Sequence, residues 1–570
     1  MSTEEKAEDS DHIEQVPETP QSQVDDDFKW DLNIVLNLSG LYMSFFSYVW
    51  LQFALPISLA FISKAFPTET NHSAWISAVV GLVQCVLSLF VGELSDIFTR
   101  RWFIIGGDLL VTIGSIVSSR ATSVDMIIGG QVISGFGAAF ILLSNPALAE
   151  AVPKRTRSVI IAAASGLSGI VGTAGTIAAG AFTKFNVGGV NQGWRVAPYM
   201  GAAFAFIAGI LCLLFYHPSD RPNPEGLSTY KRLRMIDWFG IFLGTASLTL
   251  TLLGLQFGGN PYSWSSAKVL GLLVTGLGCL VIFSLWEGKF VSFGLFPRQL
   301  FDHRNFSIVL ASQFVEGMAI NTSVAFLTEI LFTIYTSDAL DSQVRNIPFG
   351  AATLIGATIW AAIMYYTREA KWVLLAALSV TMLGAGIMSI LRPTSSYAAW
   401  FFPTAFLGAG VAGMGVSVTV IASVCTPNQF IGTALSLLNS TRGLGAAVGI
   451  VIFSQVLQSK LKSKLPAAIA EYTIAAGLPP SSVEALLIAF STGNPAAYAQ
   501  VPGVTPAVLL ALQKGVKLGY AQSFSYMWYT MLPFVGVTIV LVLFLKPSKP
   551  FTTKEVASRV QPRFGHHRHH

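Results

Sequence analysis

Charged residues are scarce in this sequence. Asp, Glu, Lys and Arg together make up 11% of its 570 residues, whereas about 25% is usual for a soluble domain. The apolar fraction is 52% and the mean hydropathy is +0.60. This composition excludes an ordinary soluble protein and is typical of an integral membrane protein.

Cysteine and catalytic motifs are also scarce. The four cysteines lie inside apolar stretches, so we interpret them as small core residues rather than a disulfide framework. The sequence contains no HExxH, no P-loop, no serine nucleophile elbow and no His or Cys cluster within an apolar stretch. A membrane enzyme or receptor is therefore disfavoured, and we expect no cofactor, no metal and no use of ATP.

The charge that is present is unevenly distributed. Residues 1–31 hold eleven acidic residues against two lysines, which predicts a disordered cytoplasmic tail over 1–34. This tail lacks the basic and apolar regions of a cleaved signal peptide. Subtracting its charges leaves 33 basic and 19 acidic residues. Basic loops that face an anionic leaflet explain this excess, so no nucleic-acid partner is expected.

Long apolar segments dominate the rest of the chain. A membrane-spanning helix needs roughly 20 apolar residues, and on this criterion we predict an all-α membrane protein with fourteen spans. The one long connection, residues 457–523, is expected to be an extracellular loop. The spans are predicted at 35–62, 75–94, 102–118, 124–146, 159–183, 197–216, 238–257, 268–287, 307–334, 349–367, 371–391, 399–425, 431–456 and 524–545.

The basic residues predict the orientation of these spans. The loops after spans 2, 4, 6, 8 and 10 hold fourteen Lys and Arg residues, and the loops after spans 1, 3, 5, 7, 9 and 11 hold seven. This bias places the even-numbered loops and both termini in the cytoplasm. It also places the glycosylation sequon that begins at Asn71 outside.

A cluster of four charges interrupts the apolar sequence at Gly92–Arg101, which reads GELSDIFTRR. The orientation places it in the cytoplasmic turn between spans 2 and 3. Gly92 allows close helix approach, and Asp96 lies at the membrane edge near Arg100 and Arg101. Charges at such a junction can hold one conformation and release it in another, so we interpret the cluster as a conformational latch. The alternative is a plain positive-inside turn, which the two arginines alone would satisfy.

The same stretch resembles the signature Gly-x-Leu-Ala-Asp-Arg-x-Gly-Arg-Arg of the major facilitator superfamily, with Ile97 and Thr99 at two departures. The resemblance implies two six-helix halves with alternating access, here 35–216 and 291–545. It also implies a loop with two additional central spans at 217–290, before a cytoplasmic tail at 546–570. In this family Asp96 would help to close the cytoplasmic side in the outward-facing state, and Glu150 would join the same charge relay.

Other segments resemble one branch of that superfamily. The segments ALP at 54–56 and IGTALSLLNSTRGLGAAVG at 431–449 are similar to fourteen-span drug:proton antiporters. GGQVISGFGAA and AGTIAAGAF resemble two antiporter motifs, with Gln131 in place of Arg and Thr176 in place of Pro. The segments YHPSDRPNPEG, IDWFGIFLG and LWEGKF resemble the fungal trichothecene efflux pumps more than other branches.

Few ionisable side chains lie within the predicted spans, where each costs about 2.5 to 3.5 kcal/mol. Glu316 is nine residues into span 9, roughly 14 Å from its cytoplasmic end, and Arg442 reaches a similar depth in span 13. We interpret this pair as a proton switch, with a structural ion pair as the alternative. Asp108 and Glu329 are further candidates, unless Asp108 only bonds to loop arginines and Glu329 is hydrated at the interface.

Uncharged polar residues within the spans are candidates for substrate binding. Gln52, Gln131 and Asn439 could bind a polyoxygenated ligand through hydrogen bonds, or could join helices. Span 1 is rich in aromatic residues, including Trp50, which suit a large and partly apolar substrate, although packing against lipid explains some of them.

These patterns together predict a secondary active transporter. We expect a monomer in the plasma membrane, or alternatively the vacuolar membrane, that exports amphipathic drug-like or mycotoxin molecules in exchange for protons. The alternative on the same fold is a siderophore-iron:proton symporter, because the direction of transport leaves little trace in composition.

Overall fold

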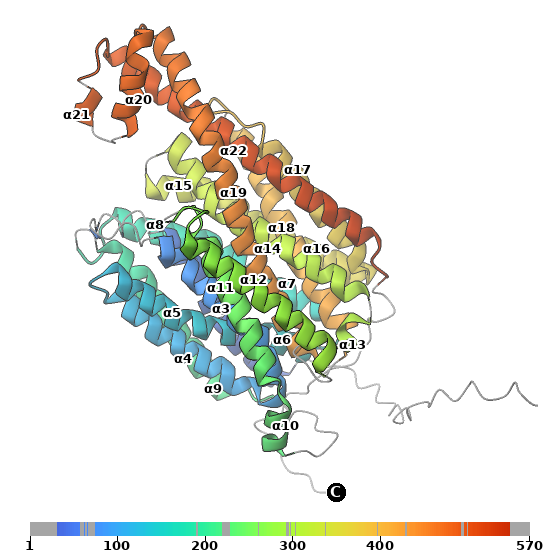
Figure 1. Ribbon diagram of the computed structural model, residues 1–570. Coiled ribbons are helices and arrows are strands. Elements are labelled where there is room, and N and C mark those ends of the chain that lie inside the picture. The colour runs from blue at the N-terminus through green and yellow to red at the C-terminus, as the bar shows by residue number, and fades with distance from the viewer. Residues whose placement is uncertain are drawn as a thin grey trace, which may run out of the picture.

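The computed structural model describes residues 31–547, apart from 58–61, 63–64, 67–73, 190–191, 219–227, 260–261, 292–295, 297, 303, 337, 396, 428–429, 492–494 and 499. Within the described part the elements are all helices (Figure 1). Fourteen of the helical segments are long and apolar enough to cross a membrane. The prediction of an all-α membrane protein with fourteen spans is therefore confirmed. Asn71 lies outside the described residues.

The first half of the bundle contains six spans, two of which are interrupted. Span 5 contains a π-helical turn, where the hydroxyls of Thr173 and Thr176 donate to the Gly169 and Gly172 carbonyls. Such irregular turns are frequent at functional sites. The elements are α1 (Leu32–Ile57), α3 (Ala74–Ile97), α4 (Arg100–Ser119), α5 (Val124–Ile141) with α6 (Ser144–Glu150), α7 (Arg157–Ile170) with η2 (Val171–Gly175) and α8 (Thr176–Lys184), and α9 (Val196–Phe215).

Two further spans lie between the halves in sequence: α11 (Trp238–Phe257) and α12 (Ala267–Leu285). Asp237 caps the start of α11: its side chain accepts from the Gly240 amide, because the first amides of a helix lack partners within it. The α11 helix contacts α3 of the first half and α19 (Ile431–Ala475) of the second. The α11 span therefore lies across the junction of the halves, and α12 packs against α11 (Figure 1).

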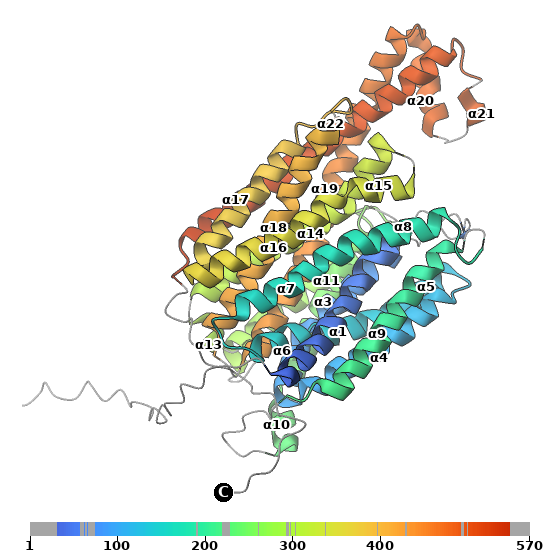
Figure 2. The ribbon, with the colours of Figure 1, turned by 180° about the vertical axis from the view of Figure 1, so that it is seen from behind.

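The second half repeats the arrangement with six spans, of which α19 is the longest at 45 residues. Figure 2 shows these helices beside the first half, with α7 and α16 adjacent to each other. The elements are α13 (Arg298–Phe301), α14 (Arg304–Ile330) with η5 (Leu331–Tyr335), α15 (Ala339–Arg345) with α16 (Ile347–Thr367), α17 (Ala370–Met388), α18 (Tyr397–Cys425), α19 and α22 (Pro506–Leu543).

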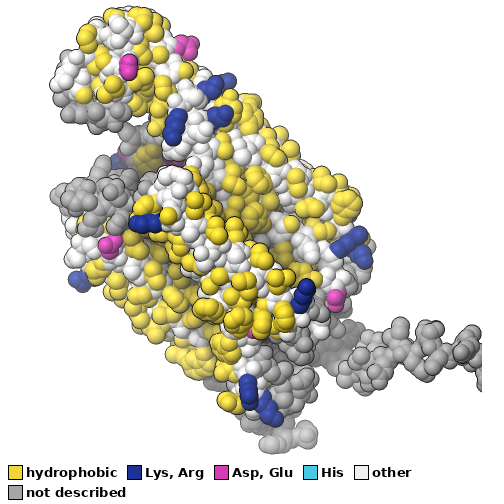
Figure 3. All heavy atoms as spheres, viewed as in Figure 1, with side chains coloured by type: hydrophobic (Ala, Val, Ile, Leu, Met, Phe, Trp, Pro, Cys, Tyr) yellow, Lys and Arg dark blue, Asp and Glu magenta, His cyan; other side chains and the backbone are white. Residues whose placement is uncertain are grey.

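The two ends of the bundle can be distinguished by their short helices. We call the end that carries α10 (Thr229–Met235) and α13 the inner end, because both belong to connections predicted to be cytoplasmic (Figure 1). The opposite end, which carries α15, is the outer end. Charged side chains lie mostly toward the two ends, and the surface between them is largely hydrophobic (Figure 3). Exposed apolar residues such as Phe206 and Val274 suit contact with lipid tails.

The connection between spans 13 and 14 differs from the expected loop, because most of it is helical. The α19 helix continues to Ala475 and α22 begins at Pro506, so both project beyond the bundle at the outer end (Figure 1). They pack with α20 (Val483–Ser491) around a small apolar core of Ile469, Leu478, Leu486, Val501, Val508 and Leu512. We call this helical region the outer extension.

Two helices of the second half approach each other closely because glycines face the contact. A Cβ atom at Gly317 of α14 would overlap the Arg442 carbonyl of α19, and one at Gly445 of α19 would overlap the Phe314 carbonyl of α14. Small residues at such crossings allow the backbones of membrane helices to meet. The close approach positions side chains of α14 and α19 to interact directly.

We expect Gly445→Ala to destabilise the protein, because the added methyl group must force α14 and α19 apart. Overpacking of this kind costs about 1–3 kcal/mol. The measurement is thermal unfolding in detergent, followed with a thiol-reactive dye that reports exposure of the buried Cys85 and Cys212. Gly271→Ala on α12 is the control, since a Cβ there meets nothing within 4 Å. An equal melting temperature for both variants would contradict the role given to this crossing.

Candidate functional site

The first candidate site lies at the inner end, where α3 of the first half meets α19 of the second. Asp96 accepts hydrogen bonds from both the backbone amide and the hydroxyl of Thr433, each at 3.0 Å. Thr433 lies in the first turn of α19, so the carboxylate satisfies an otherwise unpaired helix amide and faces the positive end of the helix dipole. A charge of the first half thus binds a helix terminus of the second.

Arg100 holds this carboxylate in place and connects it to a second acid. Its Nη2 lies 2.8 Å from Asp96 Oδ1, and its Nη1 lies 2.6 Å from Glu150 Oε2. Arg100 and Glu150 are both buried, so each needs the other's charge. Arg101, which the sequence also assigned to the latch, donates instead to the Leu213 carbonyl of α9 at 2.7 Å.

Small residues allow this approach. A Cβ atom at Gly92 would lie 2.6 Å from the Ser436 Cβ and 2.8 Å from the Gly432 carbonyl oxygen. A Cβ at Gly432 would in turn overlap Asp96. The predicted role of Gly92 in close helix approach therefore has a direct geometric counterpart at the contact between α3 and α19.

A further basic residue contributes to the contact between the halves. Arg157, at the start of α7, is fully buried and donates to the Ser423 carbonyl of α18 at 2.5 Å. In the sequence it was only one of the basic residues that set the orientation, and its spacing gave no sign of this role. We call the Asp96–Thr433 and Arg157–Ser423 interactions together the inner contact.

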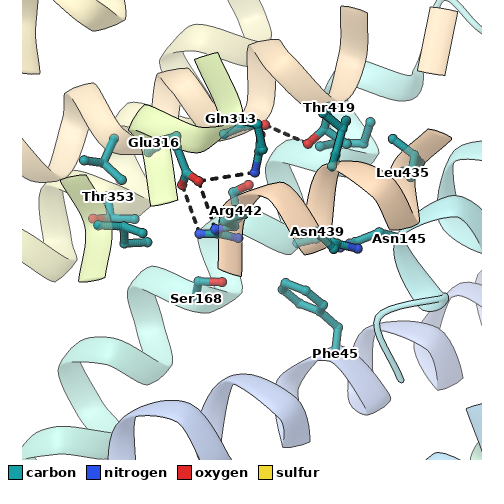
Figure 4. Close-up of a pocket in the computed structure, with 18 residues that line it drawn as sticks. Phe45, Asn145, Ser168, Gln313, Glu316, Thr353, Thr419, Leu435, Asn439 and Arg442 are labelled. Atoms are coloured by element: carbon teal, nitrogen blue, oxygen red, sulfur yellow. Dashed lines mark hydrogen bonds and ion pairs between the residues drawn. The ribbon is translucent and has the colours of Figure 1, made fainter. Parts of the chain in front are cut away.

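The second candidate site is a cavity in the middle of the bundle, between the two halves. Glu316 of α14 and Arg442 of α19 form a two-pronged ion pair, with Nε to Oε2 and Nη2 to Oε1 both at 2.9 Å (Figure 4). The Glu316 side chain is buried, whereas Arg442 is one-third exposed. The structure therefore brings together the two ionisable residues that the sequence predicted to approach each other.

Both halves contribute to the cavity wall. The first half supplies residues of α1, α6 and α7, and the second supplies residues of α14, α16, α18 and α19 (Figure 4). Glu316 and Arg442 are the charged residues of this wall, and the other polar members are uncharged. These polar members are Asn145, Ser165, Ser168, Gln313, Thr353, Thr419 and Asn439, beside apolar residues that include Phe45.

Three of the four residues that the sequence predicted to bind substrate are not in the cavity wall. Asn439 lines the cavity. Gln52 donates to Gln84 at 2.9 Å, Gln131 donates to Ser118 at 2.9 Å, and Trp50 donates to the Ala197 carbonyl at 2.9 Å. The structure therefore places these three between helices of the first half. Sequence reasoning missed Gln313 and Asn145, because no motif marks an uncharged amide that faces a cavity.

Asp108 is buried within the first half and is not among the residues that line the cavity. Its Oδ2 accepts a hydrogen bond from the Ser44 hydroxyl at 2.7 Å. Its Oδ1 has no hydrogen-bond partner within the described part of the chain. The structure thus pairs Asp108 with a hydroxyl of α1 rather than with a loop arginine.

Among the described residues of the outer end, an ion pair connects the halves. Lys184, the last residue of α8, lies 2.5 Å from Asp338 Oδ2. Asp338 also caps α15, because its side chain accepts from the Leu340 and Asp341 amides. The hydrogen bond from Lys184 and these amides lower the pKa of Asp338 below its ordinary value. We call this Lys184–Asp338 interaction the outer pair.

The arrangement of two helical halves, with a cavity between them and contacts at both ends, defines a transporter of the major facilitator type. Solved structures with this fold align along nearly the full chain. The proton:xylose symporter XylE gives a TM-score of 0.57 at 13% identity, covering 92% of this chain and 98% of that chain. The human organic anion transporter MFSD10 gives 0.55 at 12% identity, covering 90% and 100%.

Sequence comparison identifies the family within this fold. The family model of the fungal trichothecene efflux pump (TRI12) matches residues 9–569, so the chain belongs to that family. Trichothecene efflux pump TRI12 of Fusarium sporotrichioides is 24% identical over 88% of this chain and 84% of that protein. MFS-type transporter pigP of Monascus ruber is 26% identical over 94% and 89%. The resemblance inferred from the sequence is confirmed: the protein is a multi-pass membrane transporter, and not an enzyme.

We expect Asp96→Asn to fold normally but to transport about tenfold more slowly. The amide can still accept from Thr433, but it lacks the charge that pairs with Arg100 and with the helix dipole, a loss of about 1.4 kcal/mol. The measurement is the initial rate of transport per mole of monodisperse protein. Asp125→Asn, on the exposed first turn of α5, is the matched control. A wild-type rate for Asp96→Asn would show that this residue is not a latch.

The outer pair leads to a second prediction, which concerns how readily a reagent reaches the cavity from the outer end. Lys184→Gln should speed labelling of a Ser168→Cys cavity reporter by an impermeant thiol reagent, by at most about fivefold, because exposed ion pairs are weak. Asp338→Asn should act similarly, and the double variant should add little. High salt should reduce the difference.

The pH dependence of this effect has a definite sign. Because the pKa of Asp338 is lowered, the pair persists above its ordinary range and is lost only as pH falls below it. The labelling rate of each variant, divided by the rate of the Ser168→Cys protein with an intact outer pair, should therefore stay constant between pH 5 and pH 8. Protein without the reporter cysteine gives the background from the native thiols. Unchanged labelling in both variants would contradict the role of the outer pair.

Proposed function

We propose that the protein exports an amphipathic, oxygen-rich organic molecule across the plasma membrane in exchange for protons. The observation that carries this proposal is the Glu316–Arg442 ion pair in the wall of a cavity that lies between the two halves. Membership of the fungal trichothecene efflux pump family supports export as the direction of transport. The protein would act as a monomer, with the cavity formed within one chain.

The positions of the contacts between the halves support alternating access. The inner contact and the outer pair lie at opposite ends of the bundle, and both join the first half to the second. Thr433 and Arg442 are nine residues apart on α19, which is roughly 14 Å along the helix. Opening the cavity to one side would break one set of contacts and preserve the other. The inner contact would then stabilise the state that is open at the outer end, and the outer pair would stabilise the state that is open at the inner end.

The ion pair supplies a means of coupling to protons. While Arg442 faces Glu316, the carboxylate is stabilised in its charged form. If a helix movement in the absence of substrate displaces the guanidinium, a buried charge without a partner becomes costly and proton binding is favoured. A proton and the substrate would then bind in different states, which is the requirement for exchange. Asp108 is a secondary candidate for a proton site, because it is buried with one hydroxyl partner.

The cavity wall suits a molecule with oxygen atoms and apolar surface. Its uncharged amides and hydroxyls can form hydrogen bonds, and Phe45 and the aliphatic residues offer apolar contact. The opposite charges of Glu316 and Arg442 are already paired with each other, which disfavours a strongly charged substrate. Siderophore-iron import with protons stays the alternative on this fold, and the direction of coupling distinguishes the two.

The proposal is tested by proteoliposomes with an acidic lumen and a radiolabelled trichothecene as the probe. Wild-type protein should accumulate the probe in exchange for protons. Glu316→Gln should abolish accumulation while leaving slow downhill exchange, because the amide cannot carry a proton. Arg442→Ala should shift the pH dependence of transport toward higher pH, because it removes the cation that stabilises the charged carboxylate.

Four outcomes would contradict all or part of the proposal. Accumulation only when the lumen is alkaline would indicate import together with protons. Equilibration of the probe by wild type without accumulation would exclude proton coupling. No movement of the probe at all would exclude export of this class of molecule. Unchanged accumulation by Glu316→Gln would remove this carboxylate as the proton carrier, and Asp108→Asn would then be tested in the same assay.

A further inference from the structure

One amide in the cavity wall has a hydrogen-bonding group without a partner. Gln313 lies one helical turn before Glu316 on α14, is 3% exposed, and lines the cavity (Figure 4). Its Nε2 donates to Glu316 Oε2 at 3.3 Å. Its Oε1 has no hydrogen-bond partner among the described residues. A buried carbonyl oxygen that accepts no hydrogen bond is costly.

The orientation of this amide follows from the charge beside it. Glu316 is paired with Arg442, and an ionised carboxylate can only accept hydrogen bonds. The donor end of the amide must therefore face Glu316, and the acceptor end must point away from it. The ion pair thus fixes which atom of Gln313 is left to bind something else.

Two neighbouring hydroxyl groups of the second half do not donate a hydrogen bond to Gln313 Oε1. Thr419 donates to the Gly415 carbonyl of its own helix, and Thr353 donates to the Phe349 carbonyl, each at 2.8 Å. Both donors are therefore occupied within their helices. A molecule in the cavity can supply the donor that Gln313 Oε1 lacks.

We propose that Gln313 recognises the transported molecule, by accepting a hydrogen bond from its hydroxyl group through Oε1. This inference rests on the proposed function, and it narrows the substrate to a molecule that carries a free hydroxyl near an apolar scaffold. Because the same amide donates to Glu316, Gln313 directly connects substrate recognition with the carboxylate of the ion pair. A change in the hydrogen bonding of Glu316 would then alter how the amide is presented to the substrate.

The test compares the binding of two ligands that differ in their hydroxyl groups. A radiolabelled trichothecene with free hydroxyls is compared with its fully O-acetylated derivative, by equilibrium binding to detergent-purified protein without a pH gradient. Wild type should bind the hydroxylated ligand about tenfold more tightly, the effect of one hydrogen bond of ordinary strength. In Gln313→Met, which has a similar volume but no strong acceptor, the ratio should fall toward one.

A matched control is available in another buried glutamine. Gln343 of α15 is also buried, and its Oε1 also lacks a partner within the described residues, but it lies outside the cavity wall. Gln343→Met should keep the wild-type ratio. Gln313→Asn serves as a second variant if Gln313→Met fails to purify as a monodisperse protein, and it should give a reduced ratio because the shorter amide cannot reach both partners.

The outcomes separate this proposal from that of proton coupling. An unchanged preference in both Gln313 variants, equal binding of the two ligands by wild type, or no binding at all would overturn the role of Gln313. A preference that Gln313→Met abolishes would support it even if proton-driven accumulation failed, because the binding assay contains no gradient. Conversely, accumulation that needs Glu316 could persist without any hydroxyl preference.

Discussion

The cost of placing a charge inside the membrane is the constraint on which this structure depends. Each charge within or beside the spans needs a partner, and in this protein several of those partners lie on another helix. Asp96 binds the first turn of α19, and Arg157 binds the last turns of α18. Glu316 binds Arg442 across the crossing of α14 and α19. The few charges therefore mark the contacts that hold the halves together and the cavity between them.

These charged pairs depend in turn on small residues. Glycine at 92, 317, 432 and 445 brings helix backbones close enough for short polar contacts to form. The additional helices α11 and α12 contribute neither a residue to the cavity wall nor a partner to the ion pair within it. The cavity and its ion pair are thus formed by helices of the two six-span halves, with α11 packed across the junction of these halves.

The sequence predicted the fold well because hydropathy reports directly on burial in lipid. It also predicted that Glu316 and Arg442 approach each other, since an acid and a base at equal depth in one half have strong reason to pair. It could not place Gln52, Gln131 and Trp50, because a polar or aromatic residue in a span can face a cavity or a neighbouring helix. Hydropathy ended α19 near residue 456, where Lys460, Lys462 and Lys464 begin an amphipathic segment, although the helix continues to Ala475.

The continuity of α19 has a mechanical consequence. This one helix begins at the residues that Asp96 binds, carries Arg442 in the cavity wall, and ends in the outer extension. From Arg442 to Leu465 it covers roughly 35 Å. A rigid rod of that length turns a small angle into a large displacement: a rotation of about 10° at the cavity would move the far end by roughly 6 Å. In the proposed transport cycle, this helix would transmit a rearrangement at the ion pair to the outer end of the bundle.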